Sequence, residues 1–474
     1  PSDWSTISGK PYITVSSKGI VNGLSSIPND GADFGPDTML GATLPNQYGP
    51  PYTQTSGILE AVRYSYGSLN APNIPIKLLS GRFKISPDVK LYQVNSWNSS
   101  TNPFTGAPEY AIIPVPTINL PSSWGGSSAV IQNITIHGSG AQINSGGTGI
   151  NNTGLLNSGG MTIIDVSEVP APAGTTVMTF AWDRSVNTNG LNAIDIGDLV
   201  IFQATPSSSG ANIVGGMDFY ASYNLRVRNV SIYSPNNFLS TIFPSNTEIG
   251  FAGDAEIGDE GSIDELSVYA NYYGAILGGH TRVGTYSTNS DYIGLLPHGF
   301  HGVDITRYDT VGCIYNIYIL SSNMGSVRIF LFEGEDYSAN STTTNQTVAD
   351  VYVESGSYAF YPATEIEHFH MEFNNGSPAP RLPVIQNNGT GYYVTVKHIE
   401  SQPASIAGTT AGTIQPYVIE YGTNYKKIIF QFNGYENDTT TNQTIPYPAN
   451  GAPHNNALNF SSYAVITANN TGLT

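Results

Sequence analysis

Six short phrases of alternating polar and apolar residues recur along the chain, and they constrain its fold more than any other feature. Each phrase spaces its apolar residues two positions apart, which places them on one face of a β-strand. Turn residues such as Gly, Asn and Ser usually follow soon after. The phrases are Asn133–Ile136, Asn229–Ile232, Glu265–Val268, Asn316–Ile319, Asp350–Val353 and His368–Met371.

The spacing of these phrases predicts a stack of coils. They recur at uneven intervals, mostly of roughly 20 to 50 residues, and a single strand cannot bury its apolar face alone. A stack grows along one axis without needing a larger globular core, so 474 residues can form one long domain. The sequence therefore predicts an all-β protein, a β-solenoid.

The N-terminal region carries a more specific pattern. An Asp- and Gly-rich start at Asn29–Asp33 leads to Thr55–Tyr66, which has the apolar spacing of a short amphipathic helix with a Thr or Ser cap. Its apolar face holds Ile58, Leu59, Val62 and Tyr66. The next segment, Ile76–Ser86, reads as a strand, a Gly turn and a second strand.

This order resembles the opening of right-handed parallel β-helix proteins of the pectate-lyase-like superfamily, which includes phage tailspikes and many polysaccharide hydrolases and lyases. The match runs from Asn29 to Ser86 and departs from the family by an insertion, Met39 to Thr53. The resemblance implies a right-handed parallel β-helix with a short N-terminal capping helix and projecting loops. It does not choose between adhesin, lyase and hydrolase, because one fold hosts many functions.

Changes in composition divide the chain into three parts. Residues 1–54 form a lead-in and cap segment, and residues 55–436 form the parallel β-helix. Within that stack, residues from about 95 to 215 are rich in Pro, Gly, Ser and Asn and predict loop insertions, with a small excursion or a β-hairpin expected between 161 and 198. Residues 437–474 are a Thr- and Asn-rich tail or cap.

The composition favours an external location. Charged residues are 11% of the chain, against roughly 25% in ordinary soluble proteins, so Ser, Thr, Asn and Tyr must cover much of the surface. Such a surface keeps its polarity when carboxylates are protonated, which suits an acidic medium. The single cysteine, Cys313, excludes an internal disulfide and taken alone favours the cytosol.

Glycosylation sequons argue against the cytosol, although an Asn- and Thr-rich chain produces some of them by chance. On balance we predict an extracellular or virion-surface glycoprotein. The sequons begin at Asn98, Asn133, Asn151, Asn229, Asn340, Asn345, Asn375, Asn388, Asn437, Asn442, Asn459 and Asn469.

Net charge and hydropathy exclude two classes of partner. A formal charge of −18 without a basic cluster repels nucleic acid and anionic membranes. No apolar run approaches the roughly 20 residues that span a membrane, so no membrane insertion is expected.

Two neighbouring phrases predict a functional patch. Asp350–Glu354 and His368–Glu372 are offset by 18 residues (368 minus 350) and have their polar residues in matching positions. If they stack in register, Asp350 lies beside His368, Tyr352 beside His370 and Glu354 beside Glu372, about 4.8 Å apart. Adjoining coils are expected to add Asn316 and Tyr318 on one side and Thr395 and Lys397 on the other.

Several interpretations of this patch compete. In a glycan-binding site, Tyr318, Tyr352, His368 and Lys397 would contact the sugar. In a retaining hydrolase, Glu354 and Glu372 would be the carboxylate pair, with Asp350 and His370 assisting. The bland alternative is a solvated polar face. Metal binding by His368, His370 and Glu372 is disfavoured because a flat strand rarely completes a coordination shell, so no metal is predicted there.

Other acidic segments are weaker candidates. Asp254–Glu265 concentrates six carboxylates and is a possible Ca²⁺ loop, although it lacks the spacing of a known calcium motif and a solvated turn is favoured. His298–His301 with Asp304 and Asp309 faintly resembles the Gly-His-Gly element of polygalacturonase-like β-helices, but the companion motifs of that family are not visible and no catalytic role is assigned. The acidic turn Glu333–Asp336 is ambiguous in the same way as Asp254–Glu265. No other cofactor is expected.

The predicted function is recognition of cell-surface polysaccharides or glycoprotein glycans by a tailspike- or adhesin-like protein that attaches to a host, with cleavage left open. A homotrimer is expected by resemblance to tailspikes. The first alternative is a secreted hydrolase of a neutral glycan, and the second is a structural subunit of a glycosylated lattice or filament. A pectate lyase is disfavoured because 17 basic residues face 35 acidic ones and no stacked Arg or Lys pair appears.

Overall fold

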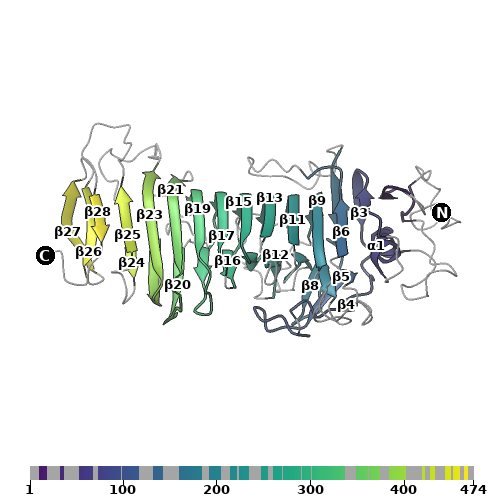
Figure 1. The fold of residues 1–474 in the computed structure, drawn as a ribbon, viewed down its shortest axis with the longest axis horizontal. Coiled ribbons are helices and arrows are strands. Elements are labelled where there is room, and N and C mark those ends of the chain that lie inside the picture. Colours follow the sequence, from purple (N-terminus) through teal and green to yellow (C-terminus); the bar gives the residue numbers. More distant parts are fainter. Residues whose placement is uncertain are drawn as a thin grey trace, which may run out of the picture. The chain divides into compact units, whose positions relative to one another are not determined.

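A computed structural model gives the fold of the chain (Figure 1). It describes residues 10–18, 32–36, 53–67, 73–97, 99–116, 132–141, 160–183, 192–203, 214–220, 224–233, 247–254, 260–269, 271–289, 291–299, 301–336, 348–360, 362–373, 384–401, 419–421, 428–432, 444–449, 452–459 and 464–467. The described part of the chain is mostly β, with strands in parallel sheets and one helix.

The chain divides into two compact units. Unit 1 comprises Pro1–Asn237 and Pro244–Tyr272, and unit 2 comprises Phe238–Phe243 and Tyr273–Thr474. These borders separate the two parts of the chain that are each compact. They do not test the expected division into a lead-in, a stack and a tail, which stays a prediction.

Unit 1 contains two runs of paired strands. The first sheet runs β1 (Ile13–Val15), β2 (Ile76–Leu78), β6 (Gln132–His137), β9 (Asn192–Phe202), β11 (Asn224–Tyr233) and β13 (Glu260–Tyr269), with β7 (Thr162–Asp165) pairing both β3 (Gly81–Lys84) and β9. The second sheet runs β12 (Ile249–Asp254), β10 (Val214–Asp218), β8 (Thr176–Asp183), β5 (Glu109–Pro116) and β4 (Tyr92–Gln93). Pairing is parallel except between β4 and β5.

Unit 2 also contains two runs. Its first sheet runs β15 (Thr281–Asn289), β17 (Val303–Val311), β19 (Val327–Asp336), β21 (Ala363–Phe373), β23 (Tyr393–Ser401), β25 (Ile428–Phe432) and β28 (Ala464–Thr467). Its second sheet runs β14 (Tyr273–Gly278), β16 (Ile293–His298), β18 (Tyr315–Ile319), β20 (Ala349–Ser357), β22 (Val384–Thr390) and β24 (Ile419–Tyr421). β28 joins antiparallel, and β26 (Thr444–Ala449) and β27 (Ala452–Asn459) form a separate antiparallel pair.

From β7 to β13 in unit 1 and from β14 to β25 in unit 2, successive strands alternate between the two sheets. In unit 2, from β14 to β25, each strand pairs in parallel with the next but one along the chain. All six phrases that the sequence singled out lie in strands, but only two of them, in β18 and β20, belong to the second sheet of unit 2. The hairpin expected between residues 161 and 198 is wrong, because β7 and β8 pair with other strands and not with each other.

The predicted amphipathic helix is present as α1 (Ile58–Tyr66), and all four residues of its expected apolar face are buried. Thr55 Oγ1 accepts the Leu59 amide at 3.2 Å, which satisfies a backbone donor of the first turn. Gly57 precedes the helix with a φ of 86°, and a Cβ there would lie 2.6 Å from the Gly35 nitrogen. Glycine is therefore required at this position. The expected strand, Gly turn and strand are β2 and β3.

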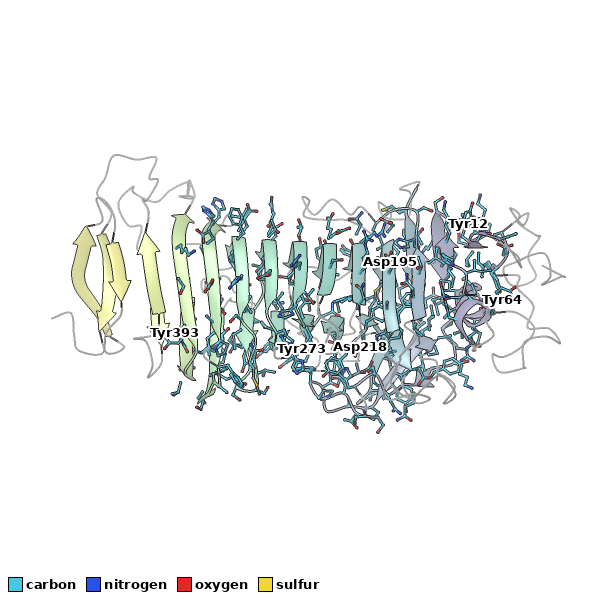
Figure 2. The ribbon with its side chains drawn as sticks, viewed as in Figure 1. Tyr12, Tyr64, Asp195, Asp218, Tyr273 and Tyr393 are labelled. Atoms are coloured by element: carbon cyan, nitrogen blue, oxygen red, sulfur yellow. The ribbon has the colours of Figure 1, made fainter. Side chains whose placement is uncertain are left out.

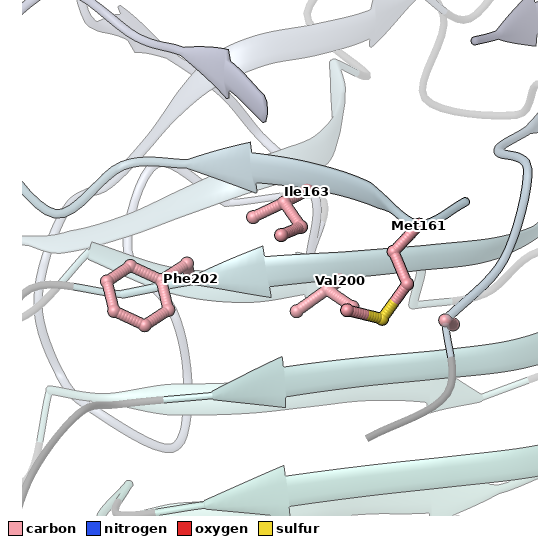
Figure 3. Close-up of a cluster of buried hydrophobic side chains, with 5 residues drawn as sticks. Met161, Ile163, Val200 and Phe202 are labelled. Carbon is pink, nitrogen blue, oxygen red and sulfur yellow. The ribbon is translucent and has the colours of Figure 1, made fainter. Parts of the chain in front are cut away.

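Apolar side chains fill the interior of unit 1 between its strands. Figure 3 shows one such cluster, in which Met161 and Ile163 from the β7 segment pack with Val200 and Phe202 of β9. Each of these side chains is at least nine-tenths buried. Burial of this kind supplies the main favourable term for a fold without disulfides.

Aromatic residues fill the interior of unit 2 in a ladder. Tyr286, Tyr308, Phe332 and Phe369 occupy the same register position on β15, β17, β19 and β21 and are fully buried. The Tyr286 and Tyr308 rings stack with centroids 5.0 Å apart, and the Phe332 and Phe369 rings stack at 4.4 Å. Each such pair contributes roughly 0.5–1.5 kcal/mol beyond the area it buries.

Two tyrosine hydroxyls connect the sheets of unit 2. Tyr286 Oη on β15 donates to the Gly294 carbonyl on β16, and Tyr308 Oη on β17 donates to the Asn316 carbonyl on β18, both at 2.6 Å. A Cβ at Gly294 would lie 2.4 Å from Tyr308 Oη, so the backbone approaches the ring closely only because residue 294 is glycine. Cys313 is also buried here, and burial raises the pKa of its thiol to about 12.

Candidate functional site

The stacking predicted for the two acidic and histidine-rich phrases is wrong. β20, with Asp350–Val353, pairs with β18 and β22, whereas β21, with His368–Met371, pairs with β19 and β23 in the other sheet. Because strands alternate between sheets, the partner of a strand lies further along the chain than the next strand. Ile317 pairs with Val351, for example, which is 34 residues on (351 minus 317).

The predicted carboxylate pair therefore loses its geometric basis. Glu354 is in the second sheet of unit 2, and Glu372 is in the first, where its register partner is Glu335. The side chain of Glu372 lies outside the described residues, as does that of Met371.

Asp350 was expected to point outward, and this is also wrong. Ala349, Asp350 and Val351 at the start of β20 are all fully buried, so strict alternation of exposed and buried residues does not hold there. Asn316 Nδ2 donates to Asp350 Oδ1 at 2.8 Å, and Asn316 also bonds to the buried Thr310 hydroxyl. Asp350 thus belongs to an interior polar row.

The second sheet of unit 2 instead brings tyrosines together. Tyr318 of β18 and Tyr352 of β20 are register partners, as the sequence predicted, and their rings stack with centroids 4.7 Å apart. Tyr315 lies 5.2 Å from each of these rings, and Tyr292 lies 5.8 Å from Tyr315. All four residues are half-buried, so part of each remains accessible to solvent.

A carboxylate is fixed at the edge of this group. Glu354 Oε1 accepts the Tyr318 hydroxyl at 3.0 Å, and Oε2 accepts the Ser321 amide at 3.0 Å. Burial, followed by the bond to Glu354, raises the pKa of Tyr318 far above its usual value, so its hydroxyl stays a donor. We call Tyr292, Tyr315, Tyr318, Tyr352 and Glu354 the tyrosine face.

The tyrosine face combines apolar rings with oriented polar groups. Tyrosine presents a flat apolar body and a polar tip, and half-exposed tyrosines are common where proteins bind amphipathic ligands. Glu354 adds an acceptor whose position two donors hold. Tyr318, Tyr352 and Glu354 were predicted site residues. Tyr315 was missed because it lies one residue before the phrase Asn316–Ile319, and Tyr292 was missed because it lies outside all six phrases.

The remaining predicted residues lie on the first sheet of unit 2. His368 packs edge-on against Phe330, with ring centroids 5.1 Å apart. Lys397 forms an ion pair with Glu367 at 2.6 Å. Thr395 pairs with Glu365, so the expected proximity of β23 to β21 is confirmed, but this region does not pair with the strands of the tyrosine face.

His370 lies in a row with two carboxyl groups. Asp309, Glu333 and His370 are register partners on β17, β19 and β21. Arg307 binds both acids, with contacts of 2.8 Å to Asp309 and 2.5 Å to Glu333. Burial and the Asp309 carboxyl raise the pKa of Glu333. Asp309 and Glu333 are thus two carboxyl groups on adjacent strands, and the pKa of one of them is raised. The sequence analysis predicted such a pair at Glu354 and Glu372, which lie in different sheets.

Other predicted sites are described only in part. Among the residues that the structure describes, no three His, Cys, Asp or Glu side chains converge as metal ligands. Residues 255–259 of the acidic loop Asp254–Glu265 fall outside those residues, as do the side chains of Asp254 and Glu260, while Asp264 and Glu265 are exposed on β13. The calcium interpretation stays a prediction.

Four sequons fall on described backbone. Asn133 and Asn229 are exposed, Asn388 is half-buried on β22, and Asn459 lies in β27. The Asn229 side chain donates to Asp198 at 3.2 Å. The other sequons lie outside the described residues.

Comparisons with known proteins add no family to these observations. The described part of the chain contains no helix with the length and hydrophobicity that crossing a bilayer requires. A search against protein-family models, curated proteins and solved structures finds no match to this chain.

Proposed function

We propose that this chain is a right-handed parallel β-helix protein of an extracellular or virion surface that recognises cell-surface glycans through the tyrosine face. The observation that carries the proposal is the stacked, half-buried pair Tyr318 and Tyr352 with a carboxylate fixed beside it. The alternation of parallel strands between two sheets supports the solenoid part of the proposal.

The chemistry of the face suits a neutral sugar. A pyranose presents an apolar C–H face and a rim of hydroxyls, so rings at the spacing of Tyr318 and Tyr352 can cover the first while Glu354 accepts from the second. An anionic glycan would meet both Glu354 and the overall charge of −18, which repel it. Neutral or amino sugars are therefore the favoured class.

A glycan array followed by titration calorimetry tests the proposal. The wild-type chain is expected to bind a neutral or amino-sugar glycan, and Tyr352→Ala is expected to weaken that binding at least tenfold, or about 1.4 kcal/mol. Tyr393→Ala is the matched control, since Tyr393 is a 37% exposed tyrosine of unit 2 on β23, away from the face (labelled in Figure 2). Equal affinity of Tyr352→Ala and wild type for the bound glycan would remove the tyrosine face from recognition.

Hydrolysis of a neutral glycan is the second candidate, and the row Asp309, Glu333 and His370 favours it. A carboxyl with a raised pKa beside a second carboxyl is the arrangement of acid and base that glycoside hydrolysis uses. Glu333→Gln is expected to abolish release of reducing ends from the glycan identified on the array. Unchanged release would exclude this row.

The assembly of the chain is tested independently. A homotrimer is proposed from the resemblance to tailspikes, and mass measurement in solution distinguishes it from a monomer. Ordered filaments or lattices without affinity for oligosaccharides would favour a structural subunit instead.

A further inference from the structure

Two carboxyl groups of unit 1 are buried against each other. Glu109 is the first residue of β5 and is 1% exposed, while Asp218 is the last residue of β10 and is fully buried (labelled in Figure 2). The two carboxyl groups are coupled, since each contributes to the pKa of the other. Two like charges in contact inside a protein cannot both be ionised without a large penalty.

The donors around the pair are divided unequally. Asp218 accepts three hydrogen bonds, from the Tyr220 amide at 3.0 Å, the Trp97 indole at 2.5 Å and the Ser96 hydroxyl at 3.3 Å. Glu109 Oε2 accepts one, from the Asn102 amide group at 2.8 Å, and within the described residues the buried Oε1 has no hydrogen-bond donor. Asp218 is thus equipped to carry the negative charge, and Glu109 to carry a proton that it donates to Asp218.

The donors come largely from one loop. Ser96, Trp97 and Asn102 lie in loop 96–108, which connects β4 and β5. Trp97 also stacks on Tyr220, with ring centroids 3.7 Å apart, and meets the edge of Phe104 at 4.9 Å. Tyr220 lies two residues after Asp218, the last residue of β10, so the contacts that hold the loop against β10 converge on Asp218 and Tyr220.

Within the described residues, the groups that act on Glu109 and Asp218 include no cation. Loop 96–108 contains no charged residue. Arg63 of α1 lies over the Tyr92 ring and interacts electrostatically with Asp183. The other titratable groups of the neighbouring elements are Glu60 on α1, Tyr110 on β5 and Glu248 just before β12.

We propose that Glu109 and Asp218 share one proton, which latches loop 96–108 onto β10, and that the latch is closed in acid and opens when the proton is lost. The loop is then a pH-controlled element of the molecule, held where an acidic medium keeps the pair protonated.

The direction of the pKa shifts agrees with this geometry. Burial, followed by the Asp218 carboxyl, raises the pKa of Glu109 well above its usual value, and burial raises the pKa of Asp218 to about 6. In the unfolded chain both groups ionise near their usual values, so the folded state retains protons that the unfolded state has lost. Both groups are therefore protonated below about pH 4, and Asp218 ionises as pH rises through about 6 while Glu109 keeps the shared proton. The latch opens as pH rises further, through the raised pKa of Glu109.

Glu109→Gln tests the proposal because glutamine mimics the protonated acid. Its amide group keeps the shape of the side chain and donates a hydrogen bond to Asp218 at every pH. Glu60→Gln is the matched control, since Glu60 is another buried carboxyl with a raised pKa, bonded to Thr55 and not to a second acid.

Two measurements read the latch. Infrared spectra of the wild type at pH 5 should contain the carbonyl band of a buried carboxylic acid that Glu109→Gln lacks. Hydrogen exchange, corrected for the intrinsic effect of pH, should show protection of the Asn102 and Gly106 amides falling at least tenfold from pH 6 to pH 10 in wild type and Glu60→Gln. In Glu109→Gln this protection should stay constant.

Three results would overturn the proposal. One is the absence of a protonated-acid band at pH 5 in wild type that can be assigned to Glu109. Another is equal pH dependence of loop protection in Glu109→Gln and wild type. The third is loss of loop protection at pH 5 on adding a chelator and its recovery with Ca²⁺, which would assign the pair to a cation.

Discussion

Glu354 and Glu109 are the same side chain in two different settings. Glu354 is half-buried on the tyrosine face, where a tyrosine hydroxyl and a backbone amide each donate to one of its oxygens. Glu109 is buried beneath loop 96–108, with one donor and a second carboxyl as neighbours. The comparison teaches that donors and burial, rather than residue type, decide whether a carboxyl serves as a fixed acceptor or as a store for a proton.

The largest effect expected from this difference is on the pH dependence of stability. The pKa of Asp218 rises from 3.8 to about 6, a shift of about 2 units, which corresponds to about 3 kcal/mol. A raised pKa stabilises the protonated fold, so the free energy of unfolding should fall by at least this amount between pH 3.5 and pH 7, because Glu109, whose pKa is also raised, adds to the fall. Asp218→Asn should show a smaller fall than wild type, as measured by urea unfolding across this range.

Glu354→Gln is the surface counterpart of that experiment. Because its carboxyl is partly solvated and held by donors, the substitution should change the slope of stability against pH by less than about 0.5 kcal/mol over the same range. Parallel slopes for Asp218→Asn and wild type would erase the distinction between the two settings.

Removing a hydrogen-bond donor should lower the free energy of unfolding more at the buried Asp350 than at the half-buried Glu354. Asn316→Ala removes a donor from the fully buried Asp350 and should lower the free energy of unfolding by about 1–3 kcal/mol. Tyr318→Phe removes a donor from Glu354, where water can replace it, and should cost less than about 1 kcal/mol. Thermal or chemical denaturation of both variants measures the difference, and a reversed order would contradict it.

A smaller effect is expected in glycan binding. Glu354→Gln keeps an oxygen acceptor but loses the charge that strengthens its bonds, so affinity should fall about threefold to tenfold, or up to about 1.4 kcal/mol. Glu109→Gln, measured by the same calorimetry at pH 4, should bind as the wild type does. A loss of binding in Glu109→Gln alone would place recognition in unit 1 and contradict the proposed site.

A small effect is expected at Asp309 and Glu333, a carboxyl pair that is less exposed than a surface pair and less buried than Glu109 and Asp218. Asp309 and Glu333 are held by Arg307, whose side chain is 48% exposed. Solvent screens this ion pair, so Arg307→Ala should cost less than about 1 kcal/mol, and raising the salt concentration should reduce that difference. A salt-independent cost above 2 kcal/mol in unfolding experiments would show that the row behaves like a buried site.

Local patterns allowed the strands and the helix to be predicted. The alternation in Asn133–Ile136 and the other phrases corresponds to strands, and α1 buries the predicted face, because apolar periodicity within a segment reflects which side of it meets the core. The sequence also predicted that Tyr318 adjoins the strand of Tyr352, and the structure makes the two residues register partners.

Pairing between strands was harder to predict. The offset between Asp350 and His368 covers the step from one sheet to the other, and the sequence contains no signal that separates this step from a return to the same sheet. The position of Glu109 against Asp218 was beyond prediction, since a loop of Ser, Asn and Pro residues brings the two together across 109 positions (218 minus 109). Contacts of this kind depend on the tertiary fold and not on local periodicity.

The hydroxyl bonds of Tyr286 and Tyr308 to the opposite sheet have a mechanical consequence. Each bond ties a strand of one sheet to the strand that follows it in the other, so a pull that separates the sheets of unit 2 must break buried bonds at several levels rather than peel one strand at a time. These ties contain no sulfur. A reducing environment therefore leaves these hydrogen bonds intact, and the mechanical stability that they give this region does not depend on the redox state of its surroundings.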